Sequence, residues 1–304
     1  MAKVVAVTNQ KGGVGKSTLT RELSAMCAIR GYRVLSIDCD PQGSLTASWM
    51  DTEKCEPNLV HCLVAPEGVR KAVSTELTPL KAAIFETPIE GLDLVGADVR
   101  LARFEREPAS AVHRLRQQLA SVASEYDIVF LDCAPSLGDL LHAALFAADY
   151  VLIPCAALHM SLEGLTELVY TIGEVRHVNK ELQILGSVIN LYKPRRLGAQ
   201  EARRAVEEIS HLVGPVFNTN LHDFAEVADA HTRKRPVIAF AGSSKAAEQI
   251  SLLTDEFLMR LKMPKSAEDA KQAARKTYEV PASKLNPIAK QPKAKNKIIN
   301  KHVA

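Results

Sequence analysis

The sequence predicts an α/β fold with a mostly parallel, twisted β-sheet flanked by helices. Short apolar runs alternate along the chain with longer helical patterns. The runs are apolar on both faces, which is typical of parallel strands covered by helices on two sides. The 304 residues are 47% hydrophobic and 24% charged, the composition of an ordinary globular protein with a sizeable core.

Each element follows from a local pattern. We expect buried strands at residues 4–7, 33–37, 92–95, 127–131, 150–153 and 185–191. We expect helices at residues 19–30, 161–178 and 244–262. Gly31 ends the first of these helices and Pro264 follows the last. Residues 50–110 otherwise read as a mixture of loops and helix.

The charge is unevenly distributed and predicts two regions. Residues 1–263 are expected to form one domain, and residues 264–304 a basic, disordered tail. From Lys265 onward the chain contains ten Lys and Arg residues but three Asp and Glu residues, and large apolar residues are few. Such a tail favours polyanions, although a tail that is merely solvated fits the same composition.

Composition also indicates in which cellular compartment the protein resides. The six cysteines form no CxxC pair and no metal-ligand ladder, which favours small buried side chains in a reduced, cytoplasmic protein. No apolar run approaches the ~20 residues that span a bilayer, so no membrane association is expected. The short Val-rich run after Met1 is interpreted as a strand, not as a signal peptide.

A phosphate-binding loop follows the first predicted strand. Residues 9–18 read NQKGGVGKST and lead into the first predicted helix, the strand–loop–helix context that such a loop requires. Glycines let backbone N–H groups turn toward phosphate oxygens, and the helix N-terminus adds partial positive charge. Lys16 is expected to bridge the β- and γ-phosphates, and the Ser17 hydroxyl to ligate Mg²⁺. The strict pattern has Gly where this chain has Gln10, next to a second lysine, Lys11.

Carboxylates follow two of the other predicted strands. Asp38 and Asp40 stand after the second strand, in the run DCDPQG, and Asp132 directly follows the 127–131 strand. Taken alone, the first run also fits an Asp-rich turn, and Asp132 a helix cap. Beside a phosphate loop these positions instead predict a magnesium site, because ligands bind at the carboxyl ends of parallel strands.

These motifs together resemble the ParA/MinD/Soj family of P-loop NTPases, over roughly residues 2–262. The match includes KGGVGKST, the DxDPQG run at residues 38–43 (switch I), and the DxxP pattern of Asp132 and Pro135 in residues 132–138 (switch II). It continues in ADYVLIP at residues 148–154, LEGL at 162–165 and the segment 94–101. The resemblance implies an ATPase with ATP and Mg²⁺ as cofactors.

The resemblance also implies roles for single residues. Lys11 would reach across a homodimer interface to the partner's nucleotide, as an arginine finger does. Asp40 would position the attacking water, Asp38 would support switch I and the metal shell, and Asp132 would hold Mg²⁺ through water. Hydrolysis would therefore depend on Lys11, Lys16 and Asp40, and the metal on Ser17, Asp38 and Asp132. The nucleotide-binding residues would be Lys11, Gly12, Gly13, Val14, Gly15, Lys16, Ser17, Thr18 and Asn190.

Asn190 is included because it stands where the family places residues near the adenine. An asparagine at a strand end is, however, also a common turn former.

The function implied by the resemblance is partitioning of a chromosome or plasmid. An ATP-bound homodimer would bind DNA non-specifically, and a ParB-like partner would stimulate hydrolysis. The protein would be cytoplasmic and nucleoid-associated. Positioning of a protein cargo would use the same chemistry, and a MinD-like division regulator on the membrane is a further alternative.

Candidate DNA contacts are basic residues in the second half of the domain. The ParA proteins that this chain resembles bind DNA through scattered arginines: Arg195 stands at one matching position, and Glu226 replaces the arginine at another. Non-specific phosphate attraction tolerates relocated cations, although an ordinary solvated basic face is equally compatible. The candidates are Arg195, Arg196, Arg203, Arg204, Arg233, Lys234 and Arg235.

Overall fold

The computed structural model describes residues 2–66, 77–157 and 162–263, so the predicted tail lies outside the described residues. Seven strands form one sheet in the order β3-β4-β2-β5-β1-β6-β7. All paired strands are parallel except β3, which runs antiparallel to β4 at the edge. This confirms the predicted fold class. The strands are β1 Lys3–Val7, β2 Val34–Cys39, β3 Phe85–Glu86, β4 Leu92–Val95, β5 Ile128–Cys133, β6 Tyr150–Ala156 and β7 Gln183–Asn190.

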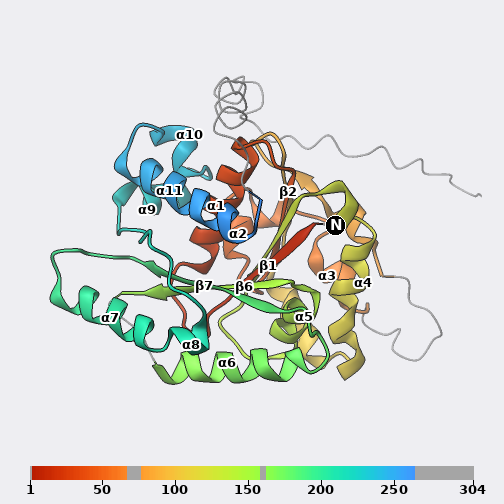
Figure 1. Cartoon of the computed structure of the whole chain (residues 1–304). Helices are drawn as coiled ribbons and strands as arrows, with labels where there is room; N and C mark the ends of the chain where they lie inside the picture. Colours follow the sequence, from red (N-terminus) through yellow and green to blue (C-terminus); the bar gives the residue numbers. More distant parts are fainter. Residues whose placement is uncertain (1, 67–76, 158–161, 264–304) are drawn as a thin grey trace, which may run out of the picture.

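Helices connect the strands and cover the sheet (Figure 1). The α-helices are α1 Lys16–Ile29, α2 Ser44–Ala47, α3 Leu59–Leu63, α4 Arg114–Ala120, α5 Asp139–Ala147, α6 Leu162–Arg176, α7 Leu197–Glu208, α8 Ser210–Val213, α9 Ala225–Thr232, α10 Val237–Ala241 and α11 Lys245–Arg260. Short 3₁₀ helices are η1 Thr52–Lys54, η2 Leu80–Ala83, η3 Val99–Arg106, η4 Ala109–His113 and η5 Ala123–Glu125.

The sheet separates two hydrophobic cores. Successive strand side chains point to opposite faces, so Val4 and Ala6 enter one core while Val5 and Val7 enter the other. The first core lies under α3 to α6, and the second under α1 and α11. Because both faces are covered, the central strands are apolar throughout, which explains why the sequence shows runs instead of alternation.

Several boundaries differ from those expected. The first helix begins at Lys16, three residues before the expected start, because Gly15 in the left-handed region (φ 87°) caps it directly after the loop. The strands β2 and β5 continue to Cys39 and Cys133, so Asp38 and Asp132 are paired strand residues and do not follow the strands. The two-residue strand β3 was not expected, since a run this short carries no periodic signal.

All six cysteines are free and buried, in agreement with the expected small buried side chains. Among the described helices, none has both the length and the apolar character that crossing a membrane requires.

Candidate nucleotide site

The phosphate loop connects β1 to α1 at the carboxyl edge of the sheet. Gly13 and Gly15 have φ of 74° and 87°, values that side-chain-bearing residues rarely adopt. At Gly12 and Gly13 a Cβ would meet nothing within 4 Å, so the space in front of the loop is open. The loop backbone is therefore arranged around a hollow of the kind that phosphate oxygens fill.

The Lys16 side chain lies inside this loop. It is 7% exposed, and its Nζ donates to the backbone carbonyls of Asn9 at 3.0 Å and Lys11 at 3.2 Å. Burial lowers the pKa of Lys16, while the neighbouring carboxylates of Asp132 and Asp40 oppose that shift. A cation held in this way is placed to meet an anionic ligand.

Asp132 lies behind Ser17 and fits a metal site. Its side chain is fully buried, and Oδ1 accepts a hydrogen bond from the Thr20 hydroxyl at 3.1 Å. Within the described residues Oδ2 has no hydrogen-bond partner. Burial and the charge of Asp38 raise the pKa of Asp132, partly opposed by the hydroxyls of Ser17 and Thr20 and by Lys16. An orphaned carboxylate oxygen close to a hydroxyl suits Mg²⁺, a hard cation that prefers oxygen ligands.

Asp38 has a different environment. Its Oδ2 accepts from the Thr46 amide at 2.8 Å and from the Thr46 hydroxyl at 2.7 Å, and its Oδ1 accepts from the Asp40 amide at 3.1 Å. Burial raises the pKa of Asp38, and these hydrogen bonds oppose the shift. Within the described residues Oδ2 accepts two hydrogen bonds and Oδ1 one, so Asp38 holds switch I in place and keeps a lone pair for the predicted metal shell.

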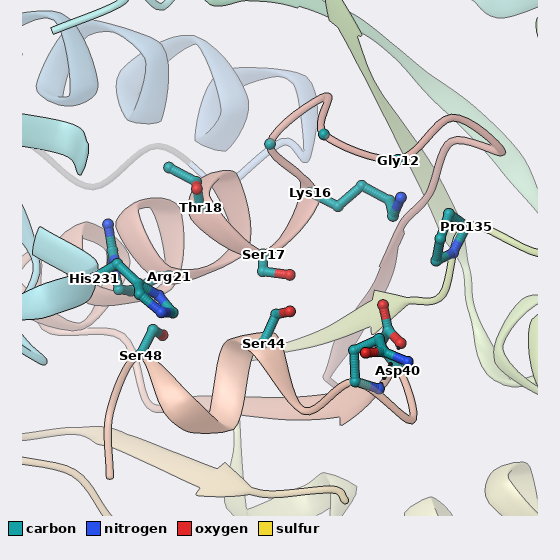
Figure 2. A pocket seen from close by; sticks show the side chains of 13 residues that line it. Gly12, Lys16, Ser17, Thr18, Arg21, Asp40, Ser44, Ser48, Pro135 and His231 are labelled. Carbon is teal, nitrogen blue, oxygen red and sulfur yellow. Dashed lines mark hydrogen bonds between the residues drawn. The ribbon is translucent and has the colours of Figure 1, made fainter. Parts of the chain in front are cut away.

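The loop and switch I enclose a cavity of about 380 Å³. In Figure 2, Ser17 and Ser44 face each other across its centre, and Lys16 extends to one side toward Pro135 and Asp40. Of the predicted residues, seven line the cavity: Gly12, Gly13, Gly15, Lys16, Ser17, Thr18 and Asp40. The volume lies within the range of about 300–1,000 Å³ usual for small-molecule sites.

Other cavity residues were not among the predicted site residues. Arg21, Ser48 and His231 lie together at the end opposite Lys16 (Figure 2), and Gln42, Ser44 and Pro135 line the remainder. Arg21 could have been found, because it stands one helical turn after Ser17 and so shares its face of α1. His231 belongs to α9, far along the chain, and no local pattern placed it here.

Two predicted nucleotide contacts lie behind the loop instead of in the cavity. Val14 is 2% exposed, and its carbonyl accepts a hydrogen bond from the Asn190 side chain at 2.8 Å. A Cβ at Gly15 would lie 2.1 Å from the Asn190 amide nitrogen, so the two residues pack tightly. Lys11 is exposed at the start of the loop, and its amide donates to the Asn9 side chain at 3.0 Å.

The candidate DNA-binding residues divide into two groups. Arg195, Arg196 and Arg204 are exposed on α7 and the loop before it. Arg203 is occupied within the protein: it forms an ion pair with Glu207 at 2.8 Å and donates to the Phe217 carbonyl at 3.3 Å. The second group belongs to the end of α9 and the turn after it. There Lys234 pairs with Asp51, Arg233 lies over the Phe240 ring, and Arg235 is half-buried.

Comparison with known proteins places these features in a family. A family model described as an AAA domain matches residues 2–184. The chain is 34% identical over 258 residues to the sporulation initiation inhibitor protein Soj of Bacillus subtilis, covering 82% of this chain and 95% of that protein. It is 32% identical over 270 residues to the chromosome partitioning protein ParA of Myxococcus xanthus, covering 88% and 91%.

Solved structures with the same fold are also known. The cobyrinic acid a,c-diamide synthase of Mycobacterium smegmatis, with bound ATP analog and magnesium, superposes with a TM-score of 0.72 at 28% identity, covering 88% of this chain and all of that one. A putative plasmid partition protein of Borrelia burgdorferi superposes with a TM-score of 0.68 at 22% identity, covering 86% of this chain and 100% of that one, a likeness of fold.

Proposed function

This chain belongs to the ParA/Soj family of P-loop ATPases, and from that premise we propose that it is an ATP-driven switch for DNA partitioning. The chain binds ATP with Mg²⁺ and hydrolyses it. In the ATP state two subunits associate and bind DNA without sequence preference, and a ParB-like partner stimulates hydrolysis and release. The protein acts in the cytoplasm, on the nucleoid, and residues 1–263 form the ATPase domain.

The observation that carries this proposal is the arrangement of two lysines around one phosphate loop. Lys16 is buried within the loop of its own subunit, whereas Lys11 is exposed at the loop's outer end. An exposed lysine there is free to approach the nucleotide of a second subunit, where its charge would stabilise the transferring phosphoryl group. Hydrolysis would then require the dimer.

The remaining residues have distinct tasks in this scheme. The loop amides and Lys16 hold the phosphates, and Asp40, in the cavity wall, orients the attacking water. Ser17 and Asp132 would hold Mg²⁺, with Asp38 supporting the metal shell, and the Mg²⁺ charge would neutralise that of the phosphates. Asp38 keeps the Asp40 segment in position through the Asp40 amide.

Size-exclusion chromatography with ATP and Mg²⁺ tests the proposal. We expect wild type and Asp40→Ala to elute as dimers, with the variant trapped in that state because it binds but does not hydrolyse. Lys11→Ala and Lys16→Ala should elute as monomers. If wild type retained no ATP at millimolar Mg²⁺, or stayed monomeric with every nucleotide, the proposal would be wrong.

Two further observations distinguish DNA partitioning from the two alternative functions. Pelleting with liposomes in the presence of ATP would indicate a MinD-like membrane regulator instead. A gene for a DNA-binding ParB-like protein beside this one would favour DNA as the cargo over a protein assembly.

A further inference from the structure

A segment far from the phosphate loop in sequence contacts both switches. This bridging segment, residues 96–105, follows β4 and includes most of η3. At its first end the Ala97 amide donates to the Thr46 hydroxyl at 2.9 Å, and the same hydroxyl donates to Asp38 at 2.7 Å. Asp38 is thereby connected through one hydroxyl to the backbone of the bridging segment.

The packing at this end is tight. A Cβ on Gly96 would lie 2.4 Å from the Cys55 sulfur and 2.8 Å from the Thr46 methyl group. A Cβ on Gly43, the last residue of switch I, would lie 2.9 Å from the Ala97 carbonyl oxygen. The backbones of switch I and the bridging segment therefore pack closely against each other. This packing leaves little room for one to move without the other.

At the other end Glu105 contacts the end of switch II. One carboxylate oxygen accepts from the Asp139 amide at 2.9 Å and the other from the Leu140 amide at 3.2 Å. These are orphan donors in the first turn of α5, and a carboxylate is well suited to them. A Cβ on Gly138 would lie 2.5 Å and 2.6 Å from the two oxygens, so a side chain there would push the Glu105 carboxylate away from these amides.

Between its two ends the segment is firmly held. Leu101 and Phe104 are fully buried in the core beneath the sheet. Asp98 begins η3 by accepting from the Arg100 amide at 2.9 Å, and it also accepts from the Asn58 side chain at 2.6 Å. The hydrogen bonds of Arg100 hold the pKa of Asp98 at about 2, so this anchor stays charged at physiological pH.

We propose that Glu105 is a positioning residue for ATP hydrolysis. It fixes the start of α5, and thereby Pro135 of switch II in the cavity wall, at a set distance from switch I. The inference rests on the proposed ATPase function. Glu105 does not touch the cavity itself, so its loss should impair the hydrolytic step more than the binding of nucleotide.

Glu105→Ala tests this directly, with Glu107→Ala as a matched control. Glu107 stands two residues after this segment but pairs with Arg114 at 2.9 Å and accepts from the Ala65 amide, away from both switches. We expect Glu105→Ala to lower kcat at saturating ATP by about tenfold, with the affinity of single subunits for a fluorescent ATP analogue changed by less than about threefold. Glu107→Ala should lower thermal stability but leave kcat unchanged.

A second substitution separates positioning from general destabilisation. Gly138 has φ of −78°, which alanine adopts freely, so Gly138→Ala should act mainly by displacing the Glu105 carboxylate. We expect Gly138→Ala to reproduce the loss of kcat in Glu105→Ala. The double variant Glu105→Ala/Gly138→Ala should lose no more kcat than either single variant, because without the Glu105 carboxylate the added methyl group has room.

The outcomes are distinct. Additive losses in the double variant, equal loss in Glu107→Ala, or an unchanged kcat in Glu105→Ala would each overturn the positioning role. If wild type in the same assay bound the analogue but showed no hydrolysis, the proposed function would fail, independently of Glu105.

Discussion

At the scale of single residues, the phosphate loop depends on two asparagine side chains that hold it from behind. Asn9 is 5% exposed; its amide donates to the Pro154 carbonyl at 2.8 Å, and its oxygen accepts from Lys11. Asn190 is 2% exposed and donates to the Val14 carbonyl. Asn9 joins the loop to β6 and Asn190 joins it to the end of β7, so the loop is shaped before any ligand arrives. Such preorganisation lowers the cost of binding.

Asn190→Ala tests whether this residue supports the loop or reads the adenine. Loss of one buried hydrogen bond costs about 1–3 kcal/mol, so we expect ATP to bind about tenfold more weakly. A residue that acts through the loop should weaken ATP and GTP equally, whereas a residue that reads adenine should weaken ATP more. Titration of both nucleotides by fluorescence or calorimetry would distinguish the two roles.

Asn179→Ala provides a matched control for that titration. Asn179 is 5% exposed and donates to the carbonyls of Leu145 and Ala148, remote from the loop. It should lose stability without loss of nucleotide affinity. A similar affinity loss in both variants would mean that the effect is one of general destabilisation.

At the scale of elements, α1 connects the nucleotide site to the C-terminal helices through a buried ion pair. Arg21 and Glu22 are each 1% exposed and lie 2.8 Å apart. Arg21 also donates to the Val227 carbonyl in α9, and Glu22 accepts from the Val237 amide at the start of α10. Burial raises the pKa of Glu22, an effect that the Arg21 charge opposes. The pair therefore holds α9 and α10 against the helix that begins in the phosphate loop.

Glu22→Ala should strongly destabilise the fold because it leaves the Arg21 charge buried without its partner. We expect a loss of about 3–5 kcal/mol in the free energy of unfolding, measured by urea denaturation without nucleotide. The double variant Arg21→Met/Glu22→Leu should lose less, since no charge is then buried. A double variant less stable than Glu22→Ala would contradict this account.

Arg33→Ala removes an exposed ion pair and serves as the comparison for the buried pair of Arg21 and Glu22. Arg33 pairs with Asp127 at 3.2 Å, but its side chain is 58% exposed. Solvent screening should limit the change in unfolding free energy to about 1 kcal/mol or less.

At the scale of the whole molecule, the exposed cations on α7 and the preceding loop are joined to the segment that leads into α9. The Lys193 ammonium pairs with Asp223 at 2.6 Å, and Tyr192 forms a β-bridge with His222. In Figure 1, α7 and α9 lie on the same side of the molecule. A surface built from separate elements in this way can offer several cations to one run of phosphates.

Removing exposed cations should change the salt dependence of ATP-dependent DNA binding. For wild type we expect affinity to fall steeply between low and physiological salt. Arg195→Ala or Arg204→Ala should each reduce the slope of log K against log salt by about 0.9, the value for one lost phosphate contact. Fluorescence anisotropy with a short duplex across a salt series measures that slope.

Arg203→Ala serves as the internal comparison, because its guanidinium already bonds Glu207 and the Phe217 carbonyl. Its slope should equal that of wild type. Binding that did not respond to salt would exclude phosphate contacts as the basis of DNA affinity.

The sequence by itself determined the fold class and the central chemistry. Parallel strands buried on both faces are apolar throughout, so β1, β2, β4, β5, β6 and β7 were visible as runs. The phosphate loop could equally be predicted, because its glycines, lysine and hydroxyl must stand at fixed spacing in one short stretch. Local signals of this kind need no knowledge of what packs against them.

Only the tertiary structure decided how the distant parts meet. It placed Asn190 behind the loop, His231 in the cavity wall, and Glu105 against the start of α5. It also showed that Arg203 is engaged within the protein while Arg204 is exposed, although the two are neighbours in the chain. Contacts between elements depend on side-chain direction and helix packing across many intervening residues, and no local periodicity records them.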